Sequence, residues 1–278
     1  MQVGIFAKTF PGSDPAAVLG AAHRAGYAVV QYNMACSGVG SLPAALAPET
    51  AAAVRNAAAE AAVGIAAVSA TYNMIHPDLA KRAAGRQAFA AIAAAAPLMG
   101  ARLVTLCTGS RDAGDQWRAH PDNQSAAAWQ DLLDEFTQIL PLAERHDIIL
   151  GVEPERGNVI NSAARARQLL EALGSDRVRI VLDAANLVDG APQRDWAAII
   201  EGAAEVLHGA IVLAHAKDRT TDGNVAAPGL GAIDFGHFVR TLHAVGFDGA
   251  LVTHGLGADE AASAAEFLRE TLAREGIA

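Results

Sequence analysis

Four side chains that can bind metal ions or transfer protons stand at the ends of short apolar runs. Glu153 ends IILGVE, Asp183 ends VRIVLD, His215 ends AIVLAH and His254 closes ALVTH. Carboxylate and imidazole groups together suit a divalent metal ion. One such residue alone is commonly a hydrogen-bonded structural group, but two carboxylates buried together are costly without a cation or another partner. If the fold brings the four run ends together, they predict a metal site.

The elements that must position these residues are short apolar runs alternating with longer helical patterns. Four to eight apolar residues between turn signals are typical of buried strands, and apolar residues at helical spacing indicate amphipathic helices. The predicted strands are residues 2–6, 28–32, 64–69, 102–106, 148–153, 178–183, 210–215 and 248–253. The predicted helices lie near residues 15–25, 48–62, 79–98, 124–145, 161–174, 193–206, 234–245 and 258–273.

The strands are continuously apolar, as expected for a parallel sheet that helices cover. Eight strand–helix units in 278 residues predict an α/β protein, a single (β/α)8 TIM barrel domain over residues 1–278. A doubly wound open sheet is the alternative, but no glycine-rich loop follows the first strand, and GLGAID at 229–234 is a weak nucleotide motif. The longest loops, 107–123 and 216–233, follow strands and should lie at the barrel's carboxyl-terminal face.

The composition excludes several kinds of partner. The formal net charge is −9 and the sequence has no basic stripe, so we expect no nucleic-acid binding. No uncharged apolar run approaches the roughly 18 residues of a membrane span. Cys36 and Cys107 fit no CxxC pattern, and the first ten residues do not read as a signal peptide. We therefore expect reduced thiols in a cytoplasmic protein that does not bind membranes.

Several segments together resemble a known superfamily. GVEPERGN, RIVLDAANL, VLAHAKD, GLGAIDF and GALVTHGL are similar to motifs of the sugar phosphate isomerase/epimerase superfamily, whose members have a xylose isomerase-like TIM barrel. The resemblance implies Glu153, Asp183 and His215 as metal ligands. It also marks two departures: His254 stands where the family usually has a glutamate ligand, and Asn186 stands where sugar epimerases often have a substrate-contacting histidine.

The first departure bears on the chemistry that the resemblance implies. In the family's epimerases one glutamate removes a proton next to a carbonyl and a second returns it on the opposite face. Glu153 remains as one acid/base. His254 is either the second acid/base or only the fourth metal ligand, which would leave one-base chemistry such as aldose–ketose isomerisation. An imidazole in place of a carboxylate also favours manganese, cobalt, zinc or iron over magnesium.

Other polar residues follow strands and are candidate substrate contacts. Each also has a structural alternative, namely a rim ion pair, a solvated loop charge or loop packing. Glu155 lies two residues after Glu153, so it is alternatively a ligand or a second base. The candidate substrate-binding residues are His76, Trp117, His120, Glu155, Asn186, Lys217 and Arg219.

These features predict a metal-dependent isomerase or epimerase. Its substrate would be a small sugar, polyol-ketone or related hydroxy-carbonyl compound, converted through an enediolate. A dehydratase on the same scaffold and a non-catalytic sugar-binding relative are the alternatives. A homo-oligomer is compatible with the sequence.

Overall fold

A closed barrel of parallel strands forms the centre of the molecule, as predicted. The computed structural model describes residues 1–277. Within this range eight strands close in the order β1-β10-β7-β6-β5-β4-β3-β2, and β1 pairs with β10 from Gln2↔Ala250 to Ile5↔Thr253. The barrel strands are β1 (Gln2–Phe6), β2 (Val29–Asn33), β3 (Gly64–Ser69), β4 (Leu103–Cys107), β5 (Ile149–Glu153), β6 (Val178–Asp183), β7 (Ile211–Ala216) and β10 (Ala250–Thr253).

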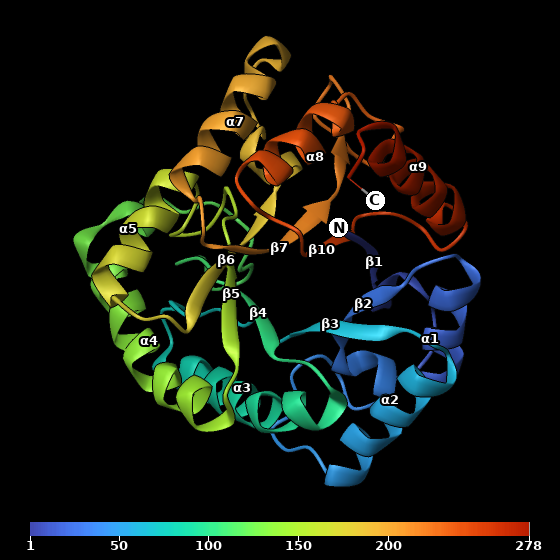
Figure 1. Cartoon of the computed structure of the whole chain (residues 1–278). Helices are drawn as coiled ribbons and strands as arrows, with labels where there is room; N and C mark the ends of the chain where they lie inside the picture. Colours follow the sequence, from blue (N-terminus) through green and yellow to red (C-terminus); the bar gives the residue numbers. More distant parts are fainter. Residues whose placement is uncertain (278) are drawn as a thin grey trace.

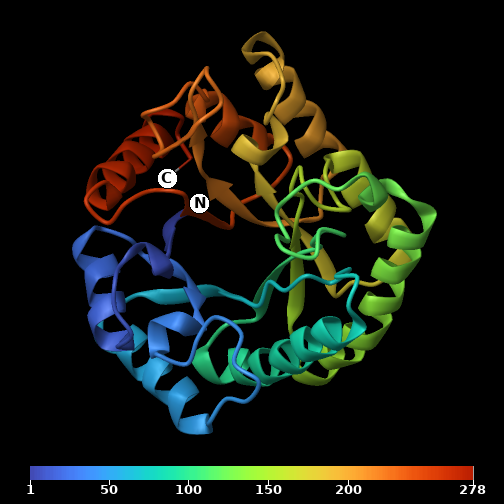
Figure 2. The same cartoon turned by 180° about the vertical axis from the view of Figure 1, so that it is seen from behind.

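Helices form a ring outside this barrel (Figures 1 and 2). Side chains of Asp14, Asp78, Ser125, Ser162 and Asp234 accept hydrogen bonds from the first backbone N–H groups of α1, α3, α4, α5 and α8. These caps fix where the helices begin. The helices are α1 (Pro15–Arg24), α2 (Pro48–Glu60), α3 (Leu79–Met99), α4 (Ala126–His146), α5 (Ala163–Leu173), α6 (Ala184–Leu187), α7 (Trp196–Val206), α8 (Phe235–Ala244) and α9 (Ala261–Arg274).

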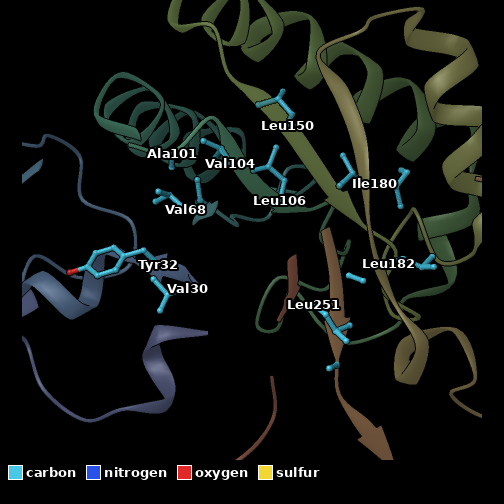
Figure 3. Close-up of a cluster of buried hydrophobic side chains, with 14 of the residues drawn as sticks. Val30, Tyr32, Val68, Ala101, Val104, Leu106, Leu150, Ile180, Leu182 and Leu251 are labelled. Carbon is cyan, nitrogen blue, oxygen red and sulfur yellow. The ribbon is translucent and has the colours of Figure 1, made fainter. Parts of the chain in front are cut away.

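The strands are apolar on both faces because each face packs against a different core. Residues facing outward, such as Val30, Val104 and Ile180, join the large cluster between strands and helices (Figure 3). A second, smaller cluster holds alternate strand residues and forms the apolar layer inside the barrel. Its buried members are Val29, Ala67, Leu103, Val181, Leu213, Ala250 and Val252.

The polar site lies directly above this interior layer. Side chains two residues apart on a strand point to the same face. Asp183 and His215 therefore follow the interior residues Val181 and Leu213 on the same face. Glu153 follows Gly151 in the same way, and a Cβ at Gly151 would meet Val181 and Leu103 side chains at 2.9 and 3.0 Å. The strand ends thus bring the predicted residues into one layer at the barrel mouth.

The loop after β7 contains structure that the sequence patterns did not predict. Residues Asp218–Arg219 (β8) and Val225–Ala226 (β9) form a two-stranded antiparallel hairpin. The Asp218 carboxylate is fully buried beneath the turn that leads into α8. No helix within residues 1–277 combines the length and apolar character that crossing a bilayer requires.

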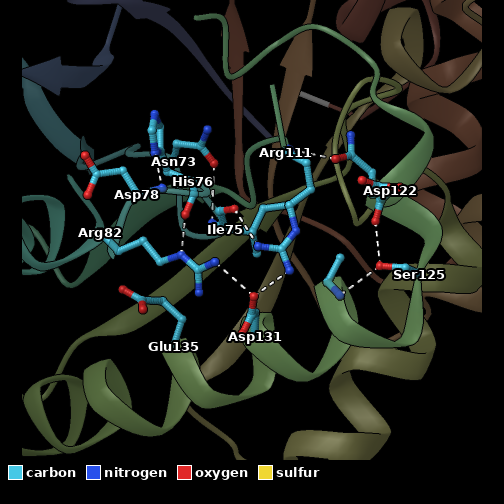
Figure 4. Close-up of polar contacts among 12 residues, drawn as sticks. Asn73, Ile75, His76, Asp78, Arg82, Arg111, Asp122, Ser125, Asp131 and Glu135 are labelled. Carbon is cyan, nitrogen blue, oxygen red and sulfur yellow. Dashed lines mark hydrogen bonds and ion pairs between the residues drawn. The ribbon is translucent and has the colours of Figure 1, made fainter. Parts of the chain in front are cut away.

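A polar cluster ties the loops after β3 and β4 to α4 (Figure 4). Asp131 on α4 accepts from both Arg82 and Arg111, with Arg82 Nη2 at 2.9 Å from Asp131 Oδ2. The same guanidinium groups donate to backbone carbonyls of His76 and Ile75. One carboxylate therefore holds two loops at the mouth.

We predict that Asp131→Asn lowers the free energy of unfolding at pH 7 by about 1–2 kcal/mol, since Asp131 is partly exposed and its ion pairs are screened. Hydrogen bonding from Arg82 and Arg111 holds the Asp131 pKa below its usual value. This stabilisation is present above the unfolded pKa of about 4 and is lost as pH falls through the lower folded pKa. Urea unfolding at pH 7 and pH 3 should show the difference between variant and parent shrinking at pH 3.

The exposed Asp134 on the same helix supplies the matched control. Asp134→Asn should change the free energy of unfolding by less than about 0.5 kcal/mol. Equal effects of the two substitutions at pH 7 would show that the Asp131 ion pairs contribute nothing specific.

Candidate functional site

A polar cavity of about 420 Å³ opens at the carboxyl-terminal mouth of the barrel. Its wall is built from strand ends and from the loops that follow them, which is where barrels of this type place their ligands. Amide, hydroxyl and ionisable side chains predominate in the wall. The lining residues are Phe6, Lys8, Gln31, Asn33, Ser41, Ser69, Thr71, Thr105, Cys107, Gln116, Trp117, Glu153, Glu155, His215 and His254.

Glu153 and His215 line one side of this cavity, and Asp183 lies next to them outside the cavity wall. One ligand atom from each of the three lies within 4.8 Å of the others, and all three side chains are buried. His215 Nδ1 is 3.0 Å from Glu153 Oε1 and 3.8 Å from Asp183 Oδ2. An imidazole nitrogen thus faces two carboxylates, which is a donor set that suits a divalent transition-metal ion.

Gln31 fixes the orientation of His215. His215 Nε2 lies 2.8 Å from Gln31 Oε1, and Gln31 Nε2 donates to Thr105 Oγ1 at 3.1 Å. Nε2 therefore carries a proton toward Gln31, and Nδ1 is directed at the carboxylates. Holding the second ring nitrogen in this way is the usual arrangement around a metal-ligating histidine.

The two carboxylate oxygens of Asp183 have different surroundings: Oδ1 faces the start of α6, and Oδ2 faces His215 and Lys217. Oδ1 accepts from the backbone N–H groups of Ala185 and Asn186 at 2.8 and 3.2 Å and caps α6. Oδ2 is buried without a hydrogen-bond partner, although the Lys217 ammonium lies 3.0 Å away as an ion pair. Asp183 Oδ2 lies 3.8 Å from His215 Nδ1 and accepts no hydrogen bond, so this buried oxygen fits a metal cation.

The charges at the site are strongly coupled. Burial raises the pKa of Glu153, but the facing His215 and Lys217 outweigh it and bring the pKa to about 2. Burial lowers the pKa of His215, and Glu153 and Asp183 raise it further than burial lowers it. Glu155 lines the cavity nearby, where burial and repulsion from Glu153 raise its pKa to about 8.

His254 lies beside the three-residue set, and its ring stacks on His215. The two ring centroids are 5.3 Å apart with an interplanar angle of 9°, and Phe6 packs against His254 at 5.2 Å. Burial and repulsion from His215 lower the pKa of His254 to about 3. Its buried Nδ1 has no hydrogen-bond partner among residues 1–277. A neutral imidazole with an unused nitrogen is in the form required of a ligand or proton acceptor.

Asn186 and Lys217 link the carboxylates of Glu153 and Asp183. Asn186 Nδ2 donates to Glu153 Oε1 at 2.9 Å, and Lys217 Nζ donates to Asn186 Oδ1. Both side chains are buried. The sequence predicted them as substrate contacts; in the structure their contacts orient Glu153 and Asp183, and neither residue is in the cavity wall.

Three of the other predicted contacts lie outside the cavity wall. His76 uses both ring nitrogens on the backbone, with Nε2 toward the Ala113 carbonyl at 3.2 Å and Nδ1 accepting from Asp78 N–H at 2.9 Å. His120 accepts from the Asp122 N–H and starts a short helical turn. Arg219 binds the Ala185 and Gly223 carbonyls. These three side chains hold loops in place.

Trp117 does line the cavity, and its loop is held there by Asn158. Trp117 is 48% exposed. Asn158 Oδ1 accepts from the Gly109 N–H at 2.8 Å, and Asn158 Nδ2 donates to the Gln116 carbonyl at 2.9 Å. The loop after β5 therefore positions the loop after β4, and with it the indole at the mouth.

We predict that Asn158→Ala releases this loop. Losing two buried hydrogen bonds should lower the free energy of unfolding by about 2 kcal/mol. Quenching of Trp117 fluorescence by acrylamide should increase, measured in a background that carries Trp129→Phe and Trp196→Phe because the sequence has three tryptophans. Asn161→Ala, at an exposed asparagine three residues later, is the matched control and should change neither measurement. Unchanged quenching in Asn158→Ala would contradict the proposed linkage.

Sequence patterns missed several cavity residues on the first four strands. Gln31, Asn33, Ser69 and Thr105 lie near strand ends inside apolar runs, where a neutral polar residue gives little functional signal. The available signal is that side chains two residues apart on a strand share a face. Gln31 lies two residues after Val29, and Thr105 lies two residues after Leu103, both of the interior layer. Cys107 is also in the wall, but burial raises the pKa of its thiol well above the usual value, so it is a protonated neighbour of Glu153.

The fold and the strand-end cluster define a (β/α)8-barrel protein with its site at the carboxyl-terminal mouth. The family described as xylose isomerase-like TIM barrel matches residues 19–274, and the chain belongs to this family. The predicted superfamily resemblance is thereby confirmed. No curated protein matches the sequence significantly.

Solved structures share the whole fold at low sequence identity. The Escherichia coli 3-keto-D-glucoside 4-epimerase is 16% identical, with a TM-score of 0.78 and coverage of 97% of this chain and 99% of that chain. A D-psicose 3-epimerase from Clostridium cellulolyticum H10 is 14% identical, with a TM-score of 0.75 and coverage of 98% and 99%. A xylose isomerase-like protein from Mycobacterium smegmatis in complex with magnesium is 14% identical, with a TM-score of 0.71 and coverage of 95% and 89%. These likenesses establish the fold.

Proposed function

We propose that this protein is a metal-dependent isomerase or epimerase of a small polyhydroxy carbonyl compound. The observation that carries the proposal is the convergence of Glu153, Asp183 and His215 at the edge of a cavity lined with hydroxyl and amide groups. The low-identity structural neighbours include epimerases acting on sugars, and another neighbour holds magnesium. A polar wall of this kind suits a ligand rich in hydroxyl groups.

Glu153, Asp183 and His215 would hold the cation, with His254 as the fourth ligand or as an acid/base. Bound there, a divalent ion supplies Lewis-acid polarisation of substrate oxygens. Glu153 then takes the proton from the carbon next to the carbonyl, because its carboxylate is ionised and reaches the cavity. Asn186 holds the carboxylate in place during that transfer. Proton return to the opposite face, with His254 as the candidate donor, would give an epimer, and return from Glu153 to the neighbouring carbon would give an isomer.

Hydrogen exchange with solvent tests the proposal most directly. Protein loaded separately with manganese, cobalt, zinc, iron or magnesium would be incubated in D₂O with ketopentoses and ketohexoses. We expect deuterium to enter at the carbon next to the carbonyl, and chelation to abolish the exchange. Exchange that survives complete metal removal, verified by metal analysis, would contradict the metal dependence. A lack of exchange with every sugar and metal would contradict the isomerase assignment.

We predict that His254→Ala weakens metal binding while His254→Glu retains it. Removing a neutral ligand should cost at least about tenfold in affinity, whereas a carboxylate restores a donor and should shift preference toward magnesium. Titration with manganese and magnesium measures both effects. His208→Ala, at an exposed histidine after α7, is the control. If both His254 variants bind metal and turn over like the parent, His254 has only a packing role.

A further inference from the structure

Lys8 lies in the cavity wall on the side opposite to the metal-facing carboxylates. It belongs to a short helical turn, Ala7–Thr9, that follows β1, and the buried Ala7 anchors that turn. In the closed barrel β1 and β5 are separated by four steps in either direction, so Lys8 and Glu153 stand across the mouth from each other. The cavity thus has a cationic side and an acidic side.

The side around Lys8 offers hydrogen-bond donors. Asn33 Oδ1 already accepts from the Ala35 backbone N–H at 3.0 Å, which leaves its Nδ2 as the donor available to a ligand. Ser41 adds a hydroxyl group to the same cavity wall. The sequence has three lysines, Lys8, Lys81 and Lys217. Lys217 pairs with Asp183, whereas no carboxylate of residues 1–277 forms an ion pair with Lys8.

We propose that Lys8, with Asn33 and Ser41, binds a carboxylate at the end of the substrate remote from Glu153. The substrate would then be a sugar acid that carries a hydroxy-ketone at one end and a carboxylate at the other. This inference rests on the proposed function, because the hydroxy-ketone end is assigned from the metal-facing residues. The ionised Glu153 repels the carboxylate from the opposite side, so the charges also set the direction in which the substrate enters.

A carboxylate fits this group better than a phosphate does. One ammonium ion can balance one negative charge, and the cavity wall contains no arginine. A phosphate group carries up to two negative charges and is usually held by several cations or by a cluster of backbone N–H groups. Neither accompanies Lys8 in the cavity wall, so the anion assigned to this position is a carboxylate.

Matched ligands that differ only at the remote end test the inference. Dissociation constants would be measured by calorimetry on the manganese-loaded protein for D-fructose, D-fructuronate and D-fructose 6-phosphate, and for the pair D-tagatose and D-tagaturonate. We expect at least one acid to bind about 10- to 100-fold more tightly than its neutral partner, as for a hydrogen-bonded charge. The preference should decrease at high salt.

Variants then assign the preference to Lys8. Lys8→Met should remove the preference for the acid and leave the affinity for the neutral sugar within about threefold, and Lys8→Arg should retain much of the preference. Lys81→Met is the matched control, because Lys81 lines a neighbouring hollow and not this cavity. The preference should be unchanged in that control.

Three results would overturn the inference: no acid binds more tightly than its neutral partner, the preference persists in Lys8→Met, or the phosphate ester binds most tightly. A Lys8-dependent preference without hydrogen exchange would retain this inference and contradict the proposed function. Hydrogen exchange on neutral sugars without any preference for the acid would retain the proposed function and contradict this inference.

Discussion

Glu153→Gln is expected to lower kcat about 10³-fold, because the amide cannot accept the proton that the carboxylate takes from substrate. General acid–base catalysis contributes about 10²–10⁴-fold in enzymes, which sets this magnitude. The substitution preserves size, so the hydrogen bond from Asn186 Nδ2 can be retained through the amide oxygen. Metal affinity should also fall, because a charged donor is replaced by a neutral one.

Saturating metal separates these two effects. At a metal concentration that fills the site of Glu153→Gln, verified by metal analysis, the loss in kcat should persist. Circular dichroism and thermal unfolding would verify that the barrel is intact. Recovery of parental kcat on adding metal would show that Glu153 only binds the ion.

Glu155→Gln is the matched comparison, since Glu155 lies in the same cavity wall but outside the Glu153, Asp183 and His215 set. We expect less than a tenfold change in kcat for this variant. If Glu155→Gln loses 10³-fold and Glu153→Gln does not, the acid/base assignment belongs to Glu155.

The fold was predictable because each strand carries its own signal. Continuous apolar runs such as VRIVLD are buried on both faces, and the helical patterns between them leave a parallel barrel as the simplest arrangement. The structure agrees, with most strand bounds within a residue or two of those predicted and the barrel closed by β1 and β10. Strand-end acids and histidines were also identifiable, because charged types at the end of an apolar run are conspicuous.

The partners of these residues were not predictable, because they are neutral and distant in sequence. Gln31 and His215 are 184 positions apart and meet only when the barrel closes. Asn158 likewise reaches Gly109 and Gln116 through loops whose conformation no short pattern specifies. His76 and Arg219 show the converse. Both lie in mouth loops and were predicted as substrate contacts, yet His76 binds backbone groups, and Arg219 binds backbone carbonyls and the Asp189 carboxylate.

Asp218→Asn is expected to give the largest loss of stability among these variants. The buried carboxylate accepts four backbone N–H groups, from Arg219 and Ile233 at Oδ1 and from Gly229 and Gly231 at Oδ2, over 2.7–3.1 Å. An asparagine would turn its NH₂ group toward two of these donors and leave them without an acceptor. The cost should be about 3 kcal/mol or more in the free energy of unfolding.

Urea unfolding of Asp218→Asn and of Asp222→Asn measures this effect against an exposed aspartate of the same hairpin. Asp222→Asn should stay within about 0.5 kcal/mol of the parent. If Asp218→Asn does not fold, Asp218→Glu provides a second test, since it keeps the charge while its extra methylene overfills a position close to Gly231.

Asp218→Asn also tests whether the aspartate of the VLAHAKD segment stabilises the fold or takes part in the metal site. Asp218 lies beside Lys217 in sequence, yet its carboxylate accepts only from backbone N–H groups, one in β8 and three in the turn that leads into α8. A folded Asp218→Asn protein should therefore lose stability much more than metal affinity. Parental stability combined with lost metal binding would instead place Asp218 in the metal site. The expected result separates VLAHAKD into His215 and Lys217, which face the site, and Asp218, which holds the loop.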